Sequence, residues 1–118
     1  MGHSYRDLIA WQKAKDLSVQ IYKATGDFPK TEIYGLTSQI RRASVSVAAN
    51  IAEGQGRLTK RDFVHFLGMS RGSLLEVESH LAISLDLGFL DKAAHDSLLA
   101  RTIEISKILN ALMKSMGG

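Results

Sequence analysis

Five polar side chains spaced along one predicted helix are the residues best placed to do chemistry. They follow one another in steps of three or four residues: Gln39, Arg42, Ser46, Asn50 and Glu53. At 100° per residue, these steps place all five in a band about 80° wide. One interpretation is a hydrogen-bonded seam that fixes the register of two helices or a subunit contact, with Glu76 as the partner of Arg42. The other is a polar groove that grips a ligand. We favour the seam, because neighbouring residues usually satisfy polar groups at the edge of a core.

A second set of candidates is basic. The net charge is +3, and residues 1–60 hold nine Lys or Arg against five Asp or Glu. The cations that could contact phosphate are Arg41, Arg42, Arg57, Lys60 and Arg61. Residues 41 to 57 would span about 20 Å on a helix, so the set predicts a track rather than a small pocket. A phosphate backbone requires only repeated positive charge, so we expect weakly sequence-selective binding to RNA or DNA. The alternative is an ordinary solvated surface.

The sequence gives no pattern typical of catalysis or of metal binding. It has no cysteine, and its histidines are scattered at His3, His65, His80 and His95. Glu76 and His80 are four residues apart, whereas the Glu-x-x-His motif of di-iron bundles needs three. The Gly54–Arg57 segment lacks the Gly-Lys-Ser/Thr ending of a phosphate loop, so we interpret it as a turn between helices. We therefore expect no enzyme activity, no metal and no cofactor.

Glycines and the single proline divide the chain into blocks of helical length. Breaks at Gly26–Pro29, Gly54–Gly56 and Gly88 predict helices over residues 6–25, 32–53, 60–87 and 92–116, with Thr59 and Asp91 as N-caps. Each block carries an apolar stripe with steps of three and four residues. The connections are short, which predicts one domain over residues 1–118, an all-α antiparallel up-down-up-down four-helix bundle. We expect a cytoplasmic protein, since no run is typical of a signal peptide or a membrane span.

Surplus apolar residues lie outside these stripes and indicate self-association. The residues expected at an oligomer interface are Leu8, Trp11, Val19, Tyr22, Val64 and Leu75. A four-helix monomer has one core, so a second apolar face predicts a wider core or, as we favour, contact with another subunit. Gly68 and Gly72 sit inside the third block, where close packing against Ala43 would explain them.

Several short segments resemble a known family. They are the run from Glu32 to Ala43, the segment Asn50-Ile51-Ala52-Glu53-Gly54, and Gly72-Ser73-Leu74. The chain resembles, over about residues 5–115, the four-helix-bundle proteins encoded in intervening sequences of 23S ribosomal RNA. It is also similar to the accessory variability determinants of diversity-generating retroelements. Ser70 departs from the pattern, where alanine is expected.

The resemblance implies a ring-like homo-oligomer, with a homopentamer as the first expectation. It also implies a function. Retroelement members bind nucleic acid and work with a reverse transcriptase, whereas the intervening-sequence members have no established activity. We therefore predict a non-enzymatic, homo-oligomeric nucleic-acid-binding accessory protein. The alternative is a protein-interaction scaffold that docks a partner such as a reverse transcriptase and does not bind nucleic acid itself.

Overall fold

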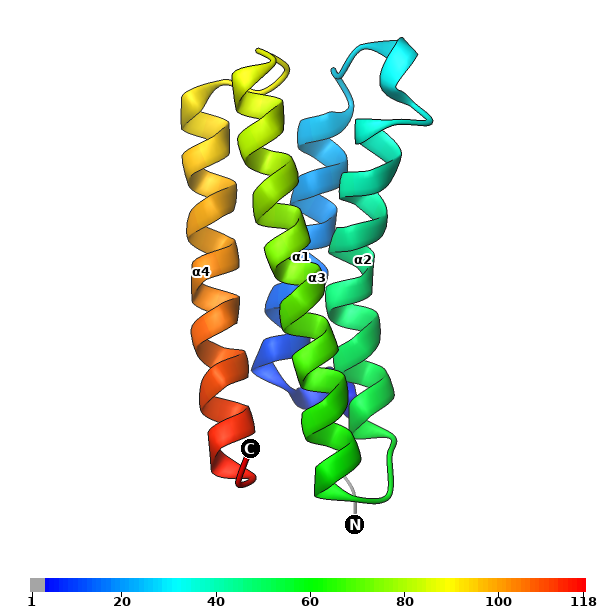
Figure 1. Cartoon of the computed structure of the whole chain (residues 1–118), viewed down its shortest axis with the longest axis vertical. Helices are drawn as coiled ribbons and strands as arrows, with labels where there is room; N and C mark the ends of the chain where they lie inside the picture. The colour runs from blue at the N-terminus through cyan, green and yellow to red at the C-terminus, as the bar shows by residue number, and fades with distance from the viewer. Residues whose placement is uncertain (1–3) are drawn as a thin grey trace.

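Four helices form an antiparallel bundle in the computed structural model, which describes residues 4–118 and so leaves His3 outside. Their bounds are α1 (Ile9–Thr25), α2 (Leu36–Gln55), α3 (Lys60–Asp86) and α4 (Lys92–Ser115), with short 3₁₀ turns at η1 (Tyr5–Asp7) and η2 (Lys30–Glu32). No strand occurs in the described part of the chain. The helices run alternately up and down, each packs beside the next, and α1 packs beside α4 (Figure 1). The predicted four-helix bundle is confirmed.

The core consists of the apolar stripes that the three-and-four spacing predicts. Each helix contributes residues that are almost fully buried, such as Leu17, Ile40, Leu74 and Ile105. Steps of three and four keep these side chains on one face of each helix, so the four faces meet along the bundle axis. At one end, the rings of Phe28 and Phe89 pack with their centroids 5.6 Å apart, which closes the core beneath two loops.

The helix ends follow the capping chemistry that the sequence predicts. Thr59 accepts a hydrogen bond from the Asp62 backbone N–H at 3.1 Å, and Asp91 accepts one from Ala94 at 2.7 Å. Both side chains satisfy N–H groups that a helix start leaves unpaired. Helix α3 ends at Asp86, two residues before Gly88, whose φ of 76° lies in the left-handed region. Glycine adopts that conformation without a steric penalty, so the chain turns there.

Helix α2 differs from its predicted span at both ends. It starts at Leu36 rather than at residue 32, because the chain first forms η2 and the Glu32 carboxylate accepts the Leu36 N–H at 3.1 Å. It continues through Gly54 to Gln55, and the turn follows at Gly56. A Cβ on Gly54 would lie 2.8 Å from the Phe66 Cβ. Gly54 therefore allows the close approach of α3, and the prediction that it ends the helix is wrong.

The expected role of the two glycines inside α3 is also wrong. A Cβ on Gly68 or Gly72 would meet no atom within 4 Å, so neither glycine packs against Ala43. Ser70 faces α2 instead, and its buried hydroxyl donates to the Val47 carbonyl at 2.8 Å. Two residues along a helix correspond to a rotation of about 200°, which carries the glycines to the far side of α3.

Candidate nucleic-acid interface and polar groove

The two adjacent arginines of α2 lie on different sides of that helix. Arg41 faces α1, where its Nε donates to Thr25 Oγ1 at 2.8 Å and its guanidinium carbon lies 4.6 Å from the centre of the Tyr22 ring. Arg42 is exposed and lines a pocket shared with α3, which includes Glu76. Adjacent residues on a helix are about 100° apart, so the pair cannot form one edge of a track.

The other three predicted cations lie together at one end of the bundle. Arg57, Lys60 and Arg61 are all exposed, in the α2–α3 turn and the first turn of α3. The Arg57 guanidinium is held by a 3.0 Å ion pair with Glu53 and lies 4.6 Å from the centre of the Phe66 ring. The structure thus divides the expected track, because it separates these three residues from Arg41 and Arg42 along α2.

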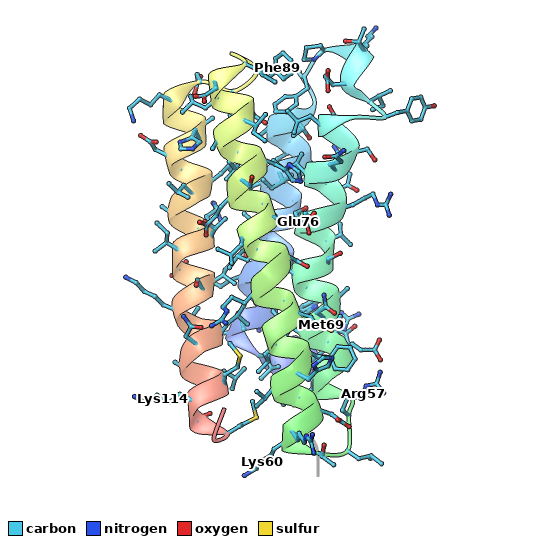
Figure 2. The ribbon with its side chains drawn as sticks, in the orientation of Figure 1. Arg57, Lys60, Met69, Glu76, Phe89 and Lys114 are labelled. Atoms are coloured by element: carbon cyan, nitrogen blue, oxygen red, sulfur yellow. The ribbon has the colours of Figure 1, made fainter. Side chains whose placement is uncertain are left out.

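The antiparallel topology adds further cations to this end. The start of α1, the end of α2, the start of α3 and the end of α4 all lie there (Figure 1). Figure 2 shows Arg57, Lys60 and Lys114 at this end and Phe89 at the other. We call this the basic end, and its cations are Arg6, Arg57, Lys60, Arg61 and Lys114. Its carboxylates are fewer: Asp7, Glu53 and Asp62. Sequence reasoning missed Arg6 and Lys114, although the up-down topology alone places them at the same end of the bundle as the α2–α3 turn.

The opposite end has the reverse balance. The cations near that end are Lys23, Lys30, Arg41 and Lys92. They are outnumbered by Asp27, Glu32, Asp86, Asp91 and Asp96. The bundle is therefore polarised along its 46 Å length, with excess positive charge at the α2–α3 turn. Such a field concentrates polyanions at one end of the molecule.

The predicted polar seam forms a groove between α2 and α3 over part of its length. Gln39, Arg42, Ser46 and Glu76 line a pocket of about 300 Å³ together with Ala43. The remaining two members have partners on their own chain segment: Asn50 donates to the Ser46 carbonyl at 2.9 Å, and Glu53 pairs with Arg57. The six residues therefore share one side of α2 and the facing surface of α3 without forming a single hydrogen-bonded network.

The prediction that Arg42 pairs with Glu76 is wrong. Arg42 is exposed, and it has no ion pair within residues 4–118. The Glu76 carboxylate points instead toward His80, with 3.8 Å between Oε2 and Nε2. Arg42 and Glu76 are both exposed, so water competes with an ion pair between them, and such a pair would add little stability. The ring nitrogens of His80 are buried, and neither has a hydrogen-bond partner in the described structure.

Neither a metal site nor a membrane-spanning helix is seen in the described part of the chain. No three His, Asp or Glu residues within 4–118 are grouped closely enough to hold a metal ion. None of the helices formed by these residues is both long and apolar enough to cross a bilayer.

The residues expected at an oligomer interface divide into two groups. Leu8, Trp11 and Val64 are partly buried and pack against the core of their own subunit. Val19, Tyr22 and Leu75 remain 44%, 46% and 59% exposed. The second group therefore offers the larger exposed surface to a partner, whereas the first group also serves the core of its own subunit.

Comparison with known proteins now places the chain in a family. The family model described as 23S rRNA-intervening sequence protein matches residues 6–111. The chain belongs to this family. A crystal structure from Bacteroides thetaiotaomicron VPI-5482, of a protein with unknown function from the S23 ribosomal protein family, has the same fold. Its TM-score is 0.81 at 23% identity, over 90% of this chain and 99% of that one. Comparison with curated proteins finds no match.

The segments that resemble the 23S rRNA-intervening sequence proteins build the contact between α2 and α3. The Asn50–Gly54 segment ends at the glycine against which Phe63 and Phe66 pack. The run from Glu32 to Ala43 supplies the carboxylate at the start of α2 and one wall of the polar groove. The Asn50–Gly54 segment therefore helps to pack α2 against α3 just before the turn that carries Arg57, Lys60 and Arg61.

Proposed function

We propose that this chain is a non-enzymatic accessory protein that binds RNA or DNA through its basic end and acts as a homo-oligomer. The observation that carries the proposal is the exposure of Arg57, Lys60 and Arg61 around one turn, at the end of the bundle where cations outnumber carboxylates. Repeated positive charge without a base-reading motif suits the sugar-phosphate backbone of any sequence.

The local electrostatics set the expected strength. The N-terminus of α3 adds partial positive charge beside Lys60, which favours a phosphate. Asp62 in the same turn opposes it, and Glu53 neutralises part of the charge of Arg57. A single subunit therefore offers a weak site. A homo-oligomer would repeat the site and raise the potential, so assembly is part of the proposed mechanism.

The exposed face of α3 supports assembly. Gly68, Gly72 and Leu75 follow one another in steps of four and three and so share one face, with open space over both glycines. A glycine inside a helix costs about 1 kcal/mol of stability relative to alanine. Nothing in the monomer packs against Gly68 or Gly72, so the monomer does not explain why alanine is absent from both positions. Close approach of a helix from another subunit would explain both glycines. A ring of five subunits is our first choice, from the family resemblance.

The test is equilibrium binding to a labelled single-stranded RNA of mixed sequence at about 50 mM salt, where phosphate contacts are strong. The test variant carries Arg57→Gln, Lys60→Gln and Arg61→Gln. The control carries Lys15→Gln, Lys23→Gln and Lys92→Gln, which removes the same charge away from the basic end. We expect at least about tenfold weaker binding for the test variant and little change for the control. No binding by the wild type, or equal loss in both variants, would refute the proposed interface.

The α3 face also favours a second candidate function, a scaffold that docks a protein such as a reverse transcriptase without binding nucleic acid. Gly72 and Leu75 would then contact that partner in place of another subunit. Salt separates the two functions, because phosphate binding weakens steeply between about 50 and 200 mM salt and a packed protein contact does not.

A further inference from the structure

A second pocket opens at the end of the bundle opposite the basic end. It lies where α1 ends and α2 begins, beneath η2, and its volume is about 320 Å³. Phe28, Pro29 and Ile33 form its apolar wall, and Lys30, Thr37 and Arg41 bring polar groups to it. This volume is within the range of small-molecule sites, which are mostly apolar with a few placed polar groups.

Arg41 is held rigidly beside this pocket and retains unused donors. Its Nε donates to Thr25 at 2.8 Å, Nη2 donates to the Tyr22 carbonyl at 3.4 Å, and the guanidinium lies over the Tyr22 ring. A guanidinium has five N–H donors, so most remain available. No ion pair of Arg41 is found within residues 4–118. A fixed cation with free donors is suited to a bidentate carboxylate.

Thr37 contributes an unpaired donor beside the same pocket. The residue is 3% exposed, it lines the pocket, and its hydroxyl is buried without a hydrogen-bond partner in the described structure. Buried hydroxyls are normally satisfied, so the unpaired Thr37 hydroxyl is a donor that a rotation of its side chain would present to a group in the cavity. The lining includes no Asp or Glu. The nearby Glu32 carboxylate is engaged with the Leu36 N–H at the start of α2.

We propose that this pocket binds a small carboxylate with an apolar body. The carboxylate would pair with Arg41 and Lys30 and accept a hydrogen bond from Thr37. The body would cover Phe28, Pro29 and Ile33. An inorganic anion would leave that apolar wall exposed, and a neutral ligand would leave the cations without a counter-charge. The site lies far from the basic end, so it stands or fails independently of nucleic-acid binding.

The experiment is an amide NMR titration of the whole chain with phenylacetate, neutral phenylacetamide and inorganic phosphate as separate probes. We expect phenylacetate to shift the Thr37 and Arg41 signals. Phenylacetamide should bind at least about tenfold more weakly, since it leaves charged groups unpaired. No localised shift with phenylacetate up to about 10 mM, beyond the millimolar range of weak complexes, overturns the proposal. Equal binding of phenylacetamide, or equal shifts from phosphate, overturns it too.

Two variants locate the site. Lys30→Gln alters an exposed side chain in η2, and Thr37→Val replaces the hydroxyl with a methyl group of similar volume. Each should weaken phenylacetate binding several-fold, whereas Lys92→Gln, at the same end but outside the pocket, should not. If Thr37→Val loses helical circular dichroism, Lys30→Gln alone decides. Unchanged binding in Lys30→Gln overturns the assignment.

Discussion

At the scale of single residues, the distance between α2 and α3 depends on a glycine without room for a methyl group. A Cβ on Gly54 would lie 2.8 Å from the Phe66 Cβ and 3.3 Å from the Phe63 carbonyl oxygen. Neither of those atoms is the flexible end of a side chain. An added methyl group must therefore separate the helices or bend the backbone, and interiors resist both changes.

Gly54→Ala should destabilise the protein by about 1–3 kcal/mol, as overpacking does, although alanine is the better helix former. Gly72→Ala is the matched control, because its added Cβ meets open space. In the monomer it should stabilise the helix by about 1 kcal/mol. Urea unfolding followed by circular dichroism measures both. A Gly54→Ala variant as stable as the wild type would show that the contact is not tight.

A second prediction at this scale concerns Asp96 in α4. Hydrogen bonds from His95 Nδ1 at 2.9 Å and from Lys92 at 3.0 Å hold the pKa of the Asp96 carboxyl below its ordinary value of 3.8. A lowered pKa in the folded state stabilises the protein above the ordinary pKa, and this stabilisation is lost as the pH falls through the lowered value. NMR titration should show the Asp96 pKa rising toward 3.8 in His95→Gln. An Asp96 pKa that is ordinary in the wild type would contradict this account.

At the scale of helices, the sequence correctly predicts features that depend on one helix alone, such as its N-cap. It fails for features that depend on a neighbouring helix, such as the contacts of a glycine. The N-caps Thr59 and Asp91 follow from local chemistry and are confirmed. Whether Gly54 ends a helix or lets another helix approach depends on Phe66, which lies in α3. The faces of Gly68 and Gly72 likewise depend on which side of α3 meets α2. Register alone could have decided the last point, because Ser70 shares the buried stripe.

The face of α3 that carries Gly72 and Leu75 yields the assembly prediction. Leu75→Glu places a charge on a side chain that is 59% exposed in the monomer, so the fold should remain intact. In an assembly the same charge would be buried without a partner, which should shift the protein toward monomers. Ala111→Glu, at an exposed position of α4, is the control and should leave the assembly unchanged. Light scattering at tens of micromolar, a range in which typical specific contacts persist, provides the measurement. A wild-type monomer there would contradict the proposed oligomer.

At the scale of the whole molecule, charge is sorted between the two ends of the bundle. The sequence shows that the first half is more basic, but antiparallel folding mixes the halves at each end. The 3₁₀ turn that carries Arg6 and the end of α4 that carries Lys114 are far apart in the chain, and the fold brings both to the end of the bundle where the α2–α3 turn lies (Figure 1). The sequence therefore predicted part of the candidate interface, namely Arg57, Lys60 and Arg61. The role of Arg41 at the α1–α2 contact could not be predicted, because it depends on Thr25 and Tyr22 as neighbours.

The salt dependence of RNA binding tests the central claim most directly. Each phosphate contact to a single strand contributes about −0.7 to the slope of log Kobs against log salt. Loss of Arg57, Lys60 and Arg61 should make the slope shallower by about 2 per site, whereas the Lys15, Lys23 and Lys92 control should keep the wild-type slope. The slopes of the wild type, the basic-end variant and the lysine control are measured by titrating a mixed-sequence RNA at salt concentrations from about 50 to 200 mM. Identical slopes for the wild type and the basic-end variant would contradict the account.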